Sequence, residues 1–218
     1  MATLEFDSLY LAFGTHRILS SIYVKCTTGQ VVGLLGRNGS GKSCLMQIVF
    51  GNLSAESKSV RYNGTSLMGN YMNKKTIAYL PQFDLLPSFV TFEQAIKFYS
   101  VDKNKIKAGF PELLEVLKRK SSEVSGGQRR LFEVLLILHS QHPFCLLDEP
   151  FSGLMPVTID RLKELILEER KNKGIIITDH LHRQIRTIAD ELYVLTNGTT
   201  YQIKNDEQLI EYGYLSEL

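Results

Sequence analysis

The sequence predicts an α/β fold, and three observations support this prediction. Residues 31–35 are a short apolar run typical of a buried strand, and a glycine-rich loop joins them to an apolar helix at residues 44–50. Residues 4–26 are rich in strand signals. Two further apolar strands, at residues 144–148 and 175–178, end in polar side chains, as strands do at the sites of α/β proteins.

Length and composition limit the class of protein. The 218 residues suit one large domain or one domain with a small insert, and a net charge of +2 from scattered residues does not indicate a nucleic-acid partner. Cys26, Cys44 and Cys145 form no C-x-x-C pair, which favours reduced thiols in a cytosolic setting. No apolar run approaches the roughly 20 residues of a membrane span, so we expect any membrane role to be peripheral.

The start of the chain is expected to be β-rich. Residues 4–13 predict a strand ended by a turn at Gly14, and residues 18–26 predict a second strand. Phe13 stands at the end of the first strand. An aromatic ring there can stack on a nucleotide base or belong to the core, and the residues alone favour neither.

The loop between the strand and the helix, G-R-N-G-S-G-K-S, fits the G-x-x-x-x-G-K-[ST] pattern of a phosphate-binding loop. Its glycines allow backbone N–H groups to surround an anion, and the following helix adds its dipole. We expect Lys42 to reach the β- and γ-phosphates and Ser43 to hold Mg²⁺. The predicted nucleotide-binding residues are Gly36, Arg37, Asn38, Gly39, Ser40, Gly41, Lys42, Ser43 and Cys44.

A polar segment and a strand follow the first helix. Residues 54–70 are turn-rich, and an Asn-Gly pair within them predicts a hairpin. Residues 75–80 predict a strand stopped by Pro81. Gln82 comes next and can coordinate Mg²⁺ or orient water if this strand lies beside the glycine loop, although a lone glutamine more often lies in solvent.

Residues 83–120 differ in character and predict a small helical insert. Thr91 and Gln94 form a capping box that opens one helix, and Pro111 is placed to begin a second helix that ends in the basic residues 118–120. Five apolar side chains at the start of the insert are either core or an exposed docking patch: Phe83, Leu85, Leu86, Phe89 and Phe92.

The segment Ser125-Gly126-Gly127-Gln128 is a second capping box and predicts the start of a helix. Two glycines directly after the cap leave backbone N–H groups uncovered by side chains. Such a helix start can meet a phosphate.

Paired acids end the apolar strand at residues 144–148. In a protein with a phosphate-binding loop, we expect Asp148 to lie in the Mg²⁺ shell. Glu149 can take the proton of an attacking water. Asp179 and His180 stand at the end of the strand at residues 175–178, where the sites of α/β proteins collect. Further predicted elements are a helix at residues 157–173 closed by Gly174, hairpin strands at residues 191–196 and 200–203, and a helix at residues 206–212.

In this order, the motifs resemble the nucleotide-binding subunit of an ATP-binding cassette (ABC) transporter over nearly the whole chain. The glycine loop matches the Walker A motif of that family, and Gln82 matches its Q-loop. Residues 124–128, V-S-G-G-Q, are similar to the family signature, with Val where Leu is usual, and residues 146–150, L-L-D-E-P, look like Walker B. Residues 178–180 resemble the switch-histidine segment, and Phe13 fits the aromatic residue that stacks on adenine.

The resemblance implies a P-loop NTPase core of ABC type with an N-terminal antiparallel β part and a small helical subdomain. Residues 1–218 would form a single domain. Within it, residues 1–82 and 144–218 would be the α/β core, and residues 83–143, which include the signature helix, would be the helical subdomain.

The resemblance also implies a head-to-tail homodimer, or a pair with another ATPase subunit, in which the Walker A loop of one copy faces the signature of the other. ATP would be bound with Mg²⁺ held by Ser43, Gln82 and Asp148. Glu149 would act as base, His180 would position the γ-phosphate, and Gln82 would sense it. The signature residues that would meet the γ-phosphate in the other copy are Ser125, Gly126, Gly127 and Gln128.

The implied function is ATP hydrolysis that energises a transmembrane permease on a separate chain, at the cytoplasmic face of the membrane. The permease would select the substrate, so the substrate is not predicted. No N-K-x-D motif of a GTPase is present. Two departures from the family are Met155, where aspartate is usual, and a short stretch between Gln82 and Ser125. Met155 keeps open the alternative of a regulatory or non-transport ABC-type ATPase with weak or no hydrolysis, whereas Glu149 and His180 favour hydrolysis.

Overall fold

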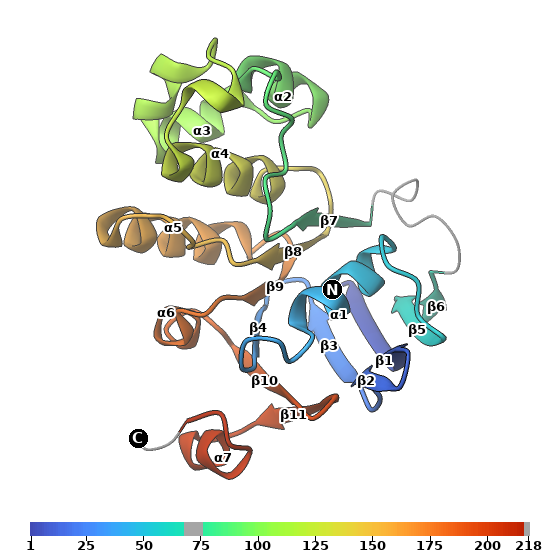
Figure 1. The fold of residues 1–218 in the computed structure, drawn as a ribbon. Helices are drawn as coiled ribbons and strands as arrows, with labels where there is room; N and C mark the ends of the chain where they lie inside the picture. Colours follow the sequence, from blue (N-terminus) through green and yellow to red (C-terminus); the bar gives the residue numbers. More distant parts are fainter. Residues whose placement is uncertain (68–75, 216–218) are drawn as a thin grey trace.

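Residues 1–67 and 76–215 are described in the computed structural model, which contains an antiparallel sheet, a mostly parallel sheet and flanking helices (Figure 1). The antiparallel sheet has the order β2–β1–β5–β6, and β3 also pairs with β1. Its strands are β1 (Thr3–Phe13), β2 (His16–Leu19), β3 (Tyr23–Thr27), β5 (Ser57–Tyr62) and β6 (Thr65–Ser66). The α/β class predicted from the sequence is confirmed.

The second sheet has the order β11–β10–β4–β9–β8–β7, and all of its strands are parallel except β11 at the edge. Its strands are β4 (Val31–Leu35), β7 (Ile77–Leu80), β8 (Phe144–Asp148), β9 (Gly174–Thr178), β10 (Glu191–Thr196) and β11 (Thr199–Ile203). Every residue of β4, β7, β8 and β9 is buried, which explains their continuous apolar runs, because both faces of a parallel sheet are covered.

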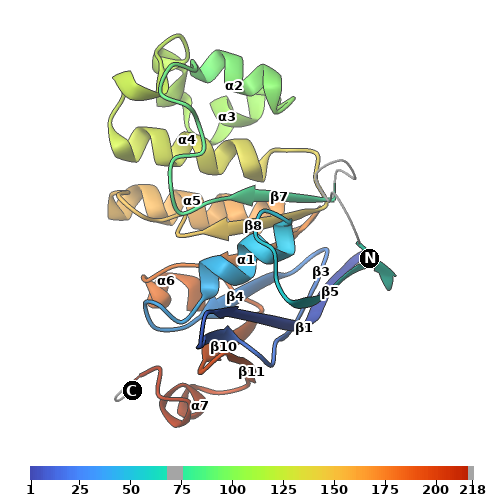
Figure 2. The ribbon, with the colours of Figure 1, turned by 45° about the vertical axis from the view of Figure 1, so that its right-hand side comes forward.

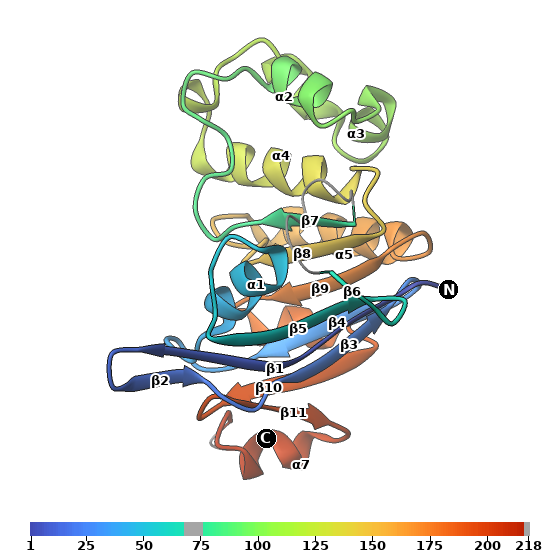
Figure 3. The same ribbon diagram turned by 90° about the vertical axis from the view of Figure 1, so that its right-hand side faces the viewer.

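Alternate residues of the parallel strands face two separate cores. Val32 and Leu34 of β4 pack in the core that contains the antiparallel sheet and helix α1 (Lys42–Phe50). Val31 and Leu35 pack in the other core, with helices α4 (Gly126–Leu138), α5 (Pro156–Glu169) and α6 (His182–Arg186). Figures 2 and 3 show α1 and the antiparallel strands on the same side of the parallel sheet. Because successive side chains of a strand point to opposite faces of the sheet, each strand contributes residues to both cores.

A group of helices lies at one end of the molecule, and helix α7 (Asp206–Glu211) lies at the opposite end (Figure 1). The group contains α2 (Phe92–Phe98), α3 (Lys103–Gly109), two 3₁₀ helices (Pro111–Val116 and Ser121–Glu123) and α4. The predicted capping boxes of α2 and α4 are both present. The rings of Phe92 and Phe132 stack with centroids 3.9 Å apart and join α2 to α4. Leu86 and Phe92 are thus core residues, whereas Phe83 is 77 % and Phe89 is 71 % exposed.

The two Asn-Gly pairs form hairpin turns as predicted, with φ of 49° at Asn63 and at Asn197 and 76° at the glycine that follows each. Residues 68–70 and 75 of the predicted turn-rich segment and strand lie outside the described residues.

Three predicted elements were wrong in their bounds. The strand predicted at residues 18–26 is two strands, because Ser20 and Ser21 leave the ladder and donate their N–H groups to Gly198 O. The helix predicted at Pro111 is a 3₁₀ helix that ends at Val116, and α3 before it was missed although Asp102 caps it. The helix predicted to end at residue 173 ends at Glu169.

Gly174 is not the helix stop that the sequence predicted but the first residue of β9. A Cβ atom there would lie 2.4 Å from the Phe144 ring and 2.9 Å from Cys26 Sγ. The glycine is therefore required by close packing between β9 and its neighbours.

We expect Gly174→Ala to lower the free energy of unfolding by about 1–3 kcal/mol, because the new methyl group overpacks the core. For a chain of this size that corresponds to a Tm lower by roughly 2–10 °C, measured by calorimetry. Gly109→Ala is the matched control, because its new Cβ would meet only Leu165 at 3.9 Å. Equal Tm values for the two variants would show that the side chains around residue 174 shift to accommodate the methyl group without loss of stability.

Candidate functional site

The carboxyl ends of β4, β7, β8 and β9 lie at one edge of the parallel sheet, so the loops that follow them meet there. These loops border a cavity of about 660 Å³. The residues that line it are Ile18, Asn38, Gly39, Gly41, Lys42, Ser43, Cys44, Gln82, Glu149 and His180. The fold thus brings together side chains that the sequence analysis selected from four separate segments.

The glycine loop takes a shape that needs glycine at two points. Gly36 has a φ of 158°, and a Cβ atom there would lie 2.6 Å from Ser40 Oγ and 2.7 Å from Leu195 O. Gly41 has a φ of 100° in the left-handed region, where it precedes α1, and its Cβ would lie 2.8 Å from Ile18. The loop can therefore curl tightly at the start of α1 with its N–H groups uncovered.

Lys42 folds back over this loop. Its Nζ donates to Gly36 O at 2.7 Å and to Arg37 O at 3.1 Å. Burial lowers the pKa of Lys42, and the carboxylates of Asp148 and Glu149 oppose that shift. A phosphate in the loop would give this half-buried cation a charged partner, which is a stronger hydrogen-bond acceptor than a carbonyl.

Asp148 ends β8 as a residue only 1 % exposed. Tyr79 donates its hydroxyl to Oδ2 at 3.3 Å, and Ser43 is hydrogen-bonded to the same carboxylate. Burial raises the pKa of Asp148, and these two hydrogen bonds oppose the rise. Within the described residues, Oδ1 is buried and has no hydrogen-bond partner. That oxygen is available to a cation.

This donor set fits Mg²⁺, which prefers oxygen ligands and usually takes one or two from the protein and the rest from phosphate and water. Asp148 Oδ1 and the Ser43 hydroxyl are such donors. In residues 1–67 and 76–215, no group of three or more His, Cys, Asp or Glu side chains could hold a metal. Tyr79 was missed from the sequence, although a tyrosine inside a wholly buried strand indicates a hydroxyl that needs a partner.

Glu149 connects the groups at the mouth of the cavity. Its Oε1 accepts a hydrogen bond from Gln82 Nε2 at 3.0 Å, and its Oε2 lies 3.8 Å from His180 Nδ1. Its φ of 54° lies in the left-handed region, which costs a non-glycine residue about 1–3 kcal/mol. Its N–H donates to Thr178 O at 2.7 Å. A strained residue held in this way is typical of a functional site.

Asp179 holds two loops of the site together. Its buried carboxylate accepts hydrogen bonds from the backbone N–H groups of Phe151 and Leu181, both at 2.9 Å. Its Oδ1 also lies 3.3 Å from His180 Nδ1. Asp179 therefore joins the loop after β8 to the loop that carries His180.

Arg130 on α4 is a second residue that the sequence analysis missed. Its guanidinium donates to Pro81 O at 2.8 Å, to Glu149 O at 3.1 Å, and to Asp148 O. It also lies 3.7 Å from Glu133, whose other oxygen accepts from the backbone of residues 85 and 86. The sequence did carry a signal for Arg130, because a charged side chain at the start of an apolar helix indicates a group that needs buried partners. Its contacts join the signature helix, the loop after β7 and the end of β8.

The signature residues lie apart from the cavity. Ser125 caps α4, with its Oγ accepting from Gln128 N at 3.2 Å. A Cβ at Gly126 would meet no atom within 4 Å, whereas one at Gly127 would lie 2.8 Å from Gly153 O. In the described part of the chain these residues do not line the nucleotide cavity.

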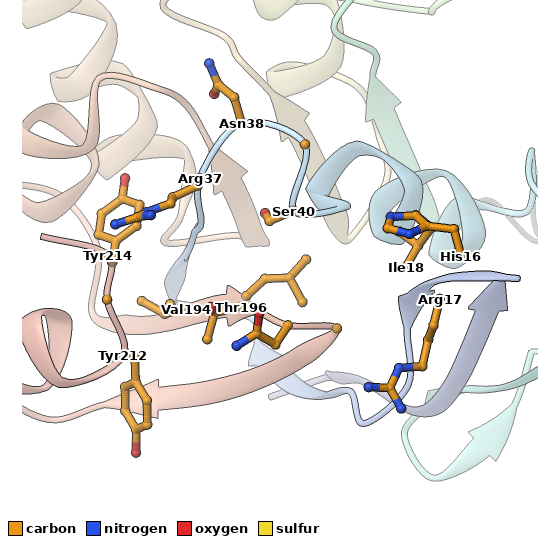
Figure 4. Close-up of a pocket in the computed structure, with 15 residues that line it drawn as sticks. His16, Arg17, Ile18, Arg37, Asn38, Ser40, Val194, Thr196, Tyr212 and Tyr214 are labelled. Carbon is orange, nitrogen blue, oxygen red and sulfur yellow. The ribbon is translucent and has the colours of Figure 1, made fainter. Parts of the chain in front are cut away.

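Other predicted residues also lie outside the lining of the cavity: Phe13, Gly36, Arg37, Ser40 and Asp148. Phe13 is 57 % exposed, so it is not a core residue and its ring is free to stack. Arg37 and Ser40 line a neighbouring cavity (Figure 4). The role of each site residue stays a prediction.

Structural comparison finds the same fold in solved ATP-binding cassettes. An ATP-binding subunit of an ABC transporter superposes with a TM-score of 0.82, 23 % identity, and coverage of 97 % of this chain and 93 % of that chain. A nucleotide-free cassette from an ABC transporter gives a TM-score of 0.79, 21 % identity, and coverage of 97 % and 95 %.

Sequence comparison agrees. The high-affinity branched-chain amino acid transport ATP-binding protein BraG of Pseudomonas aeruginosa is 31 % identical, over 89 % of each chain. The lipopolysaccharide export system ATP-binding protein LptB of Haemophilus influenzae is 26 % identical, over 100 % of this chain and 98 % of the relative. The family model described as ABC transporter matches residues 19–152. The chain therefore belongs to the ABC transporter family, and its fold is that of the ATP-binding cassette.

Proposed function

We propose that this chain binds Mg-ATP in the cavity at the edge of the parallel sheet, hydrolyses it, and thereby energises a transmembrane permease on a separate chain. The observation that carries the proposal is the meeting of Lys42, Gln82, Glu149 and His180 around one cavity. Family membership makes the chain an ATPase of the ABC class. The two relatives named above carry the names of an amino acid uptake and a lipopolysaccharide export protein, so the cargo of this chain is left open.

The chemistry follows from the positions of the side chains. The loop N–H groups and Lys42 bind the phosphates, and Mg²⁺, which Ser43, Gln82 and Asp148 would hold, neutralises phosphate charge when bound. Glu149 accepts a proton from the water that attacks the γ-phosphorus, while the bond to the β–γ bridging oxygen breaks. His180, beside Glu149 and Asp179, contacts the γ-phosphate.

Two copies of the chain, or one copy and a paired ATPase subunit, would complete each site. Among the described residues, no atom lies within 4 Å of a Cβ atom built at Gly126, so the helix start at Ser125 and Gly126 is open. Its uncovered N–H groups suit the γ-phosphate of ATP in the partner. A head-to-tail arrangement supplies this contact twice. Hydrolysis then depends on dimer formation.

The permease would dock between the helical group and the parallel sheet, on the cytoplasmic side of the membrane. An apolar cavity of about 610 Å³ lies there, lined by Leu85, Tyr99 and Ile137 among others, and Phe98 at its border is 83 % exposed. Exposed aromatic groups beside a cavity are typical of a protein-binding surface. Across the residues that the structure describes, the helices are too short or too polar to cross a bilayer, and a permease would supply that part.

We expect Lys42 and Glu149 to divide binding from chemistry. Lys42→Ala removes the cation at the loop and should lose ATP affinity. Glu149→Gln keeps the hydrogen-bonding shape but cannot accept a proton, so it should bind ATP, lose turnover and accumulate an ATP-bound dimer. Titration with ATP, phosphate release and size-exclusion chromatography measure these properties. A monomeric Glu149→Gln protein with full ATPase activity would rule out the assigned base.

We expect Mg-ATP to slow alkylation of Cys44, because its thiol lines the nucleotide cavity and is partly exposed. Cys26 and Cys145 are fully buried and serve as internal controls that react only on unfolding. Rates at each cysteine are measured by mass spectrometry with and without nucleotide. Equal rates at Cys44 under both conditions would contradict nucleotide binding in this cavity.

Substitution of Met155 is expected to have two separate effects, one on helix capping and one on dimer formation. It is 70 % exposed and occupies the N-cap of α5, where its side chain makes no capping hydrogen bond. We expect Met155→Asp to raise the free energy of unfolding by about 0.5–2 kcal/mol through capping. A carboxylate there can also accept hydrogen bonds from the partner, so ATP-dependent dimerisation and basal turnover should rise.

Met155→Asn separates these effects, because asparagine caps a helix as well as aspartate does but carries no charge. Unfolding experiments measure the capping, and analytical ultracentrifugation with ATP measures the dimer. If both variants gain stability and neither tightens the dimer, residue 155 does not couple the two sites. Absent ATPase activity in the Met155→Asp protein and in the wild type would favour the regulatory alternative.

A further inference from the structure

Tyr79 lies in the strand next to the one that ends in Asp148. It belongs to β7, whose residues are all buried, and it is 5 % exposed. Strands β7 and β8 run parallel, with Tyr79 opposite Leu146, two residues before Asp148. Side chains two residues apart on a strand point to the same face of the sheet. Tyr79, Leu146 and Asp148 therefore share one face, and this face packs in the core that contains helix α1.

The hydroxyl and the ring of Tyr79 are both held in place. The hydroxyl donates to Asp148 Oδ2 at 3.3 Å, and Gln47 of α1 is hydrogen-bonded to the same hydroxyl. A tyrosine hydroxyl has one proton, which here goes to Asp148, so the amide group of Gln47 is the donor to Tyr79. The rings of Phe50 and Tyr79 lie with their centroids 5.3 Å apart. The Tyr79 side chain is thus fixed at its tip and along its ring.

One face of α1 supplies these contacts. Ser43, Gln47 and Phe50 follow the i, i+4, i+7 spacing of a single helix face, and α1 packs against β7 and β8 (Figure 2). Ser43 is hydrogen-bonded to the Asp148 carboxylate directly, whereas Gln47 reaches it through Tyr79. Within the described residues, Asp148 Oδ1 is buried and has no hydrogen-bond partner. These hydrogen bonds therefore determine which oxygen of Asp148 is left for a cation.

We propose that Tyr79 is a positioning residue for the metal, whose hydroxyl holds Oδ2 of Asp148 so that Oδ1 is presented to Mg²⁺. This inference rests on the proposed function, because it takes the nucleotide to be bound with Mg²⁺. The described residues that line the nucleotide cavity do not include Tyr79, so Tyr79 acts through Asp148 and not by contact with ATP. Groups that hydrogen-bond to a metal ligand orient it, and their loss typically costs about 10–100-fold in metal affinity.

The test separates metal binding from nucleotide binding. AMP-PNP is titrated calorimetrically into the full chain in three buffers, which contain Mg²⁺, Ca²⁺ or EDTA. Tyr79→Phe keeps the ring and removes only the hydroxyl. We expect this variant to bind Mg-AMP-PNP about tenfold more weakly than the wild type, equal to ~1.4 kcal/mol, and to bind metal-free AMP-PNP with unchanged affinity. Ca-AMP-PNP should weaken by a smaller factor, because Ca²⁺ accepts irregular coordination whereas Mg²⁺ demands near-ideal octahedral geometry.

Two further variants test the assignment to this hydroxyl. Tyr193→Phe is the matched control, because Tyr193 is a strand tyrosine in the same core, 3 % exposed, whose hydroxyl is hydrogen-bonded to the backbone of Lys25. It should leave all three affinities unchanged. Gln47→Leu removes the donor to Tyr79 and leaves Tyr79 and Asp148 in place. It should weaken Mg-AMP-PNP by a smaller factor than Tyr79→Phe does, again with no effect in EDTA.

Three results would count against the inference. Unchanged Mg-AMP-PNP affinity in Tyr79→Phe, with a wild type that binds AMP-PNP more tightly in Mg²⁺ than in EDTA, would overturn the positioning role and leave the proposed function intact. Equal weakening in all three buffers would also overturn it, because the hydroxyl would then support the fold in general. A wild type that binds AMP-PNP equally well in Mg²⁺ and in EDTA would contradict the proposed Mg-ATP function and, with it, this inference.

Discussion

The buried guanidinium of Arg130 is the interaction on which the arrangement of the site depends. It donates to carbonyl oxygens of Pro81, Asp148 and Glu149, which belong to the loop after β7 and the end of β8. Hydrogen bonds from a charged donor are each worth about 1.5–3 kcal/mol, and their loss in a buried place costs more than their net gain. Because Arg130 is on α4, the helix that carries the signature is joined directly to the acids at the nucleotide cavity.

The hydrogen bonds from Arg130 also explain how Glu149 keeps an unfavourable backbone conformation. With a φ of 54°, the residue is held at both ends: its N–H donates to Thr178 O and its carbonyl accepts from Arg130. In this conformation the Glu149 carboxylate accepts a hydrogen bond from Gln82 and lies 3.8 Å from His180 Nδ1. The surrounding structure therefore supports a conformation that the residue would not adopt by itself.

The same edge of the sheet holds charges at different depths. Asp148 is buried, with one oxygen paired to Tyr79 and the other without a hydrogen-bond partner in the described residues, whereas Glu149 is partly exposed. Two neighbouring carboxylates thus differ in environment, as expected if one holds a cation and the other handles a proton. The glycine loop lines both this cavity and the neighbouring cavity shown in Figure 4, so a single backbone segment contacts both.

The sequence by itself determined most local elements and selected the candidate site residues. Strands, caps and turns follow from short-range rules, and this is why the glycine loop, both capping boxes and both Asn-Gly hairpins were predicted correctly. The site residues were also chosen from the sequence, because Lys42, Asp148, Glu149 and His180 end strands or begin a helix in a recognised motif. Tertiary structure decided what depends on distant partners. Gly174 packs against Phe144, Tyr79 finds Asp148, and Arg130 clamps two loops from another helix, and no local pattern encodes these long-range contacts.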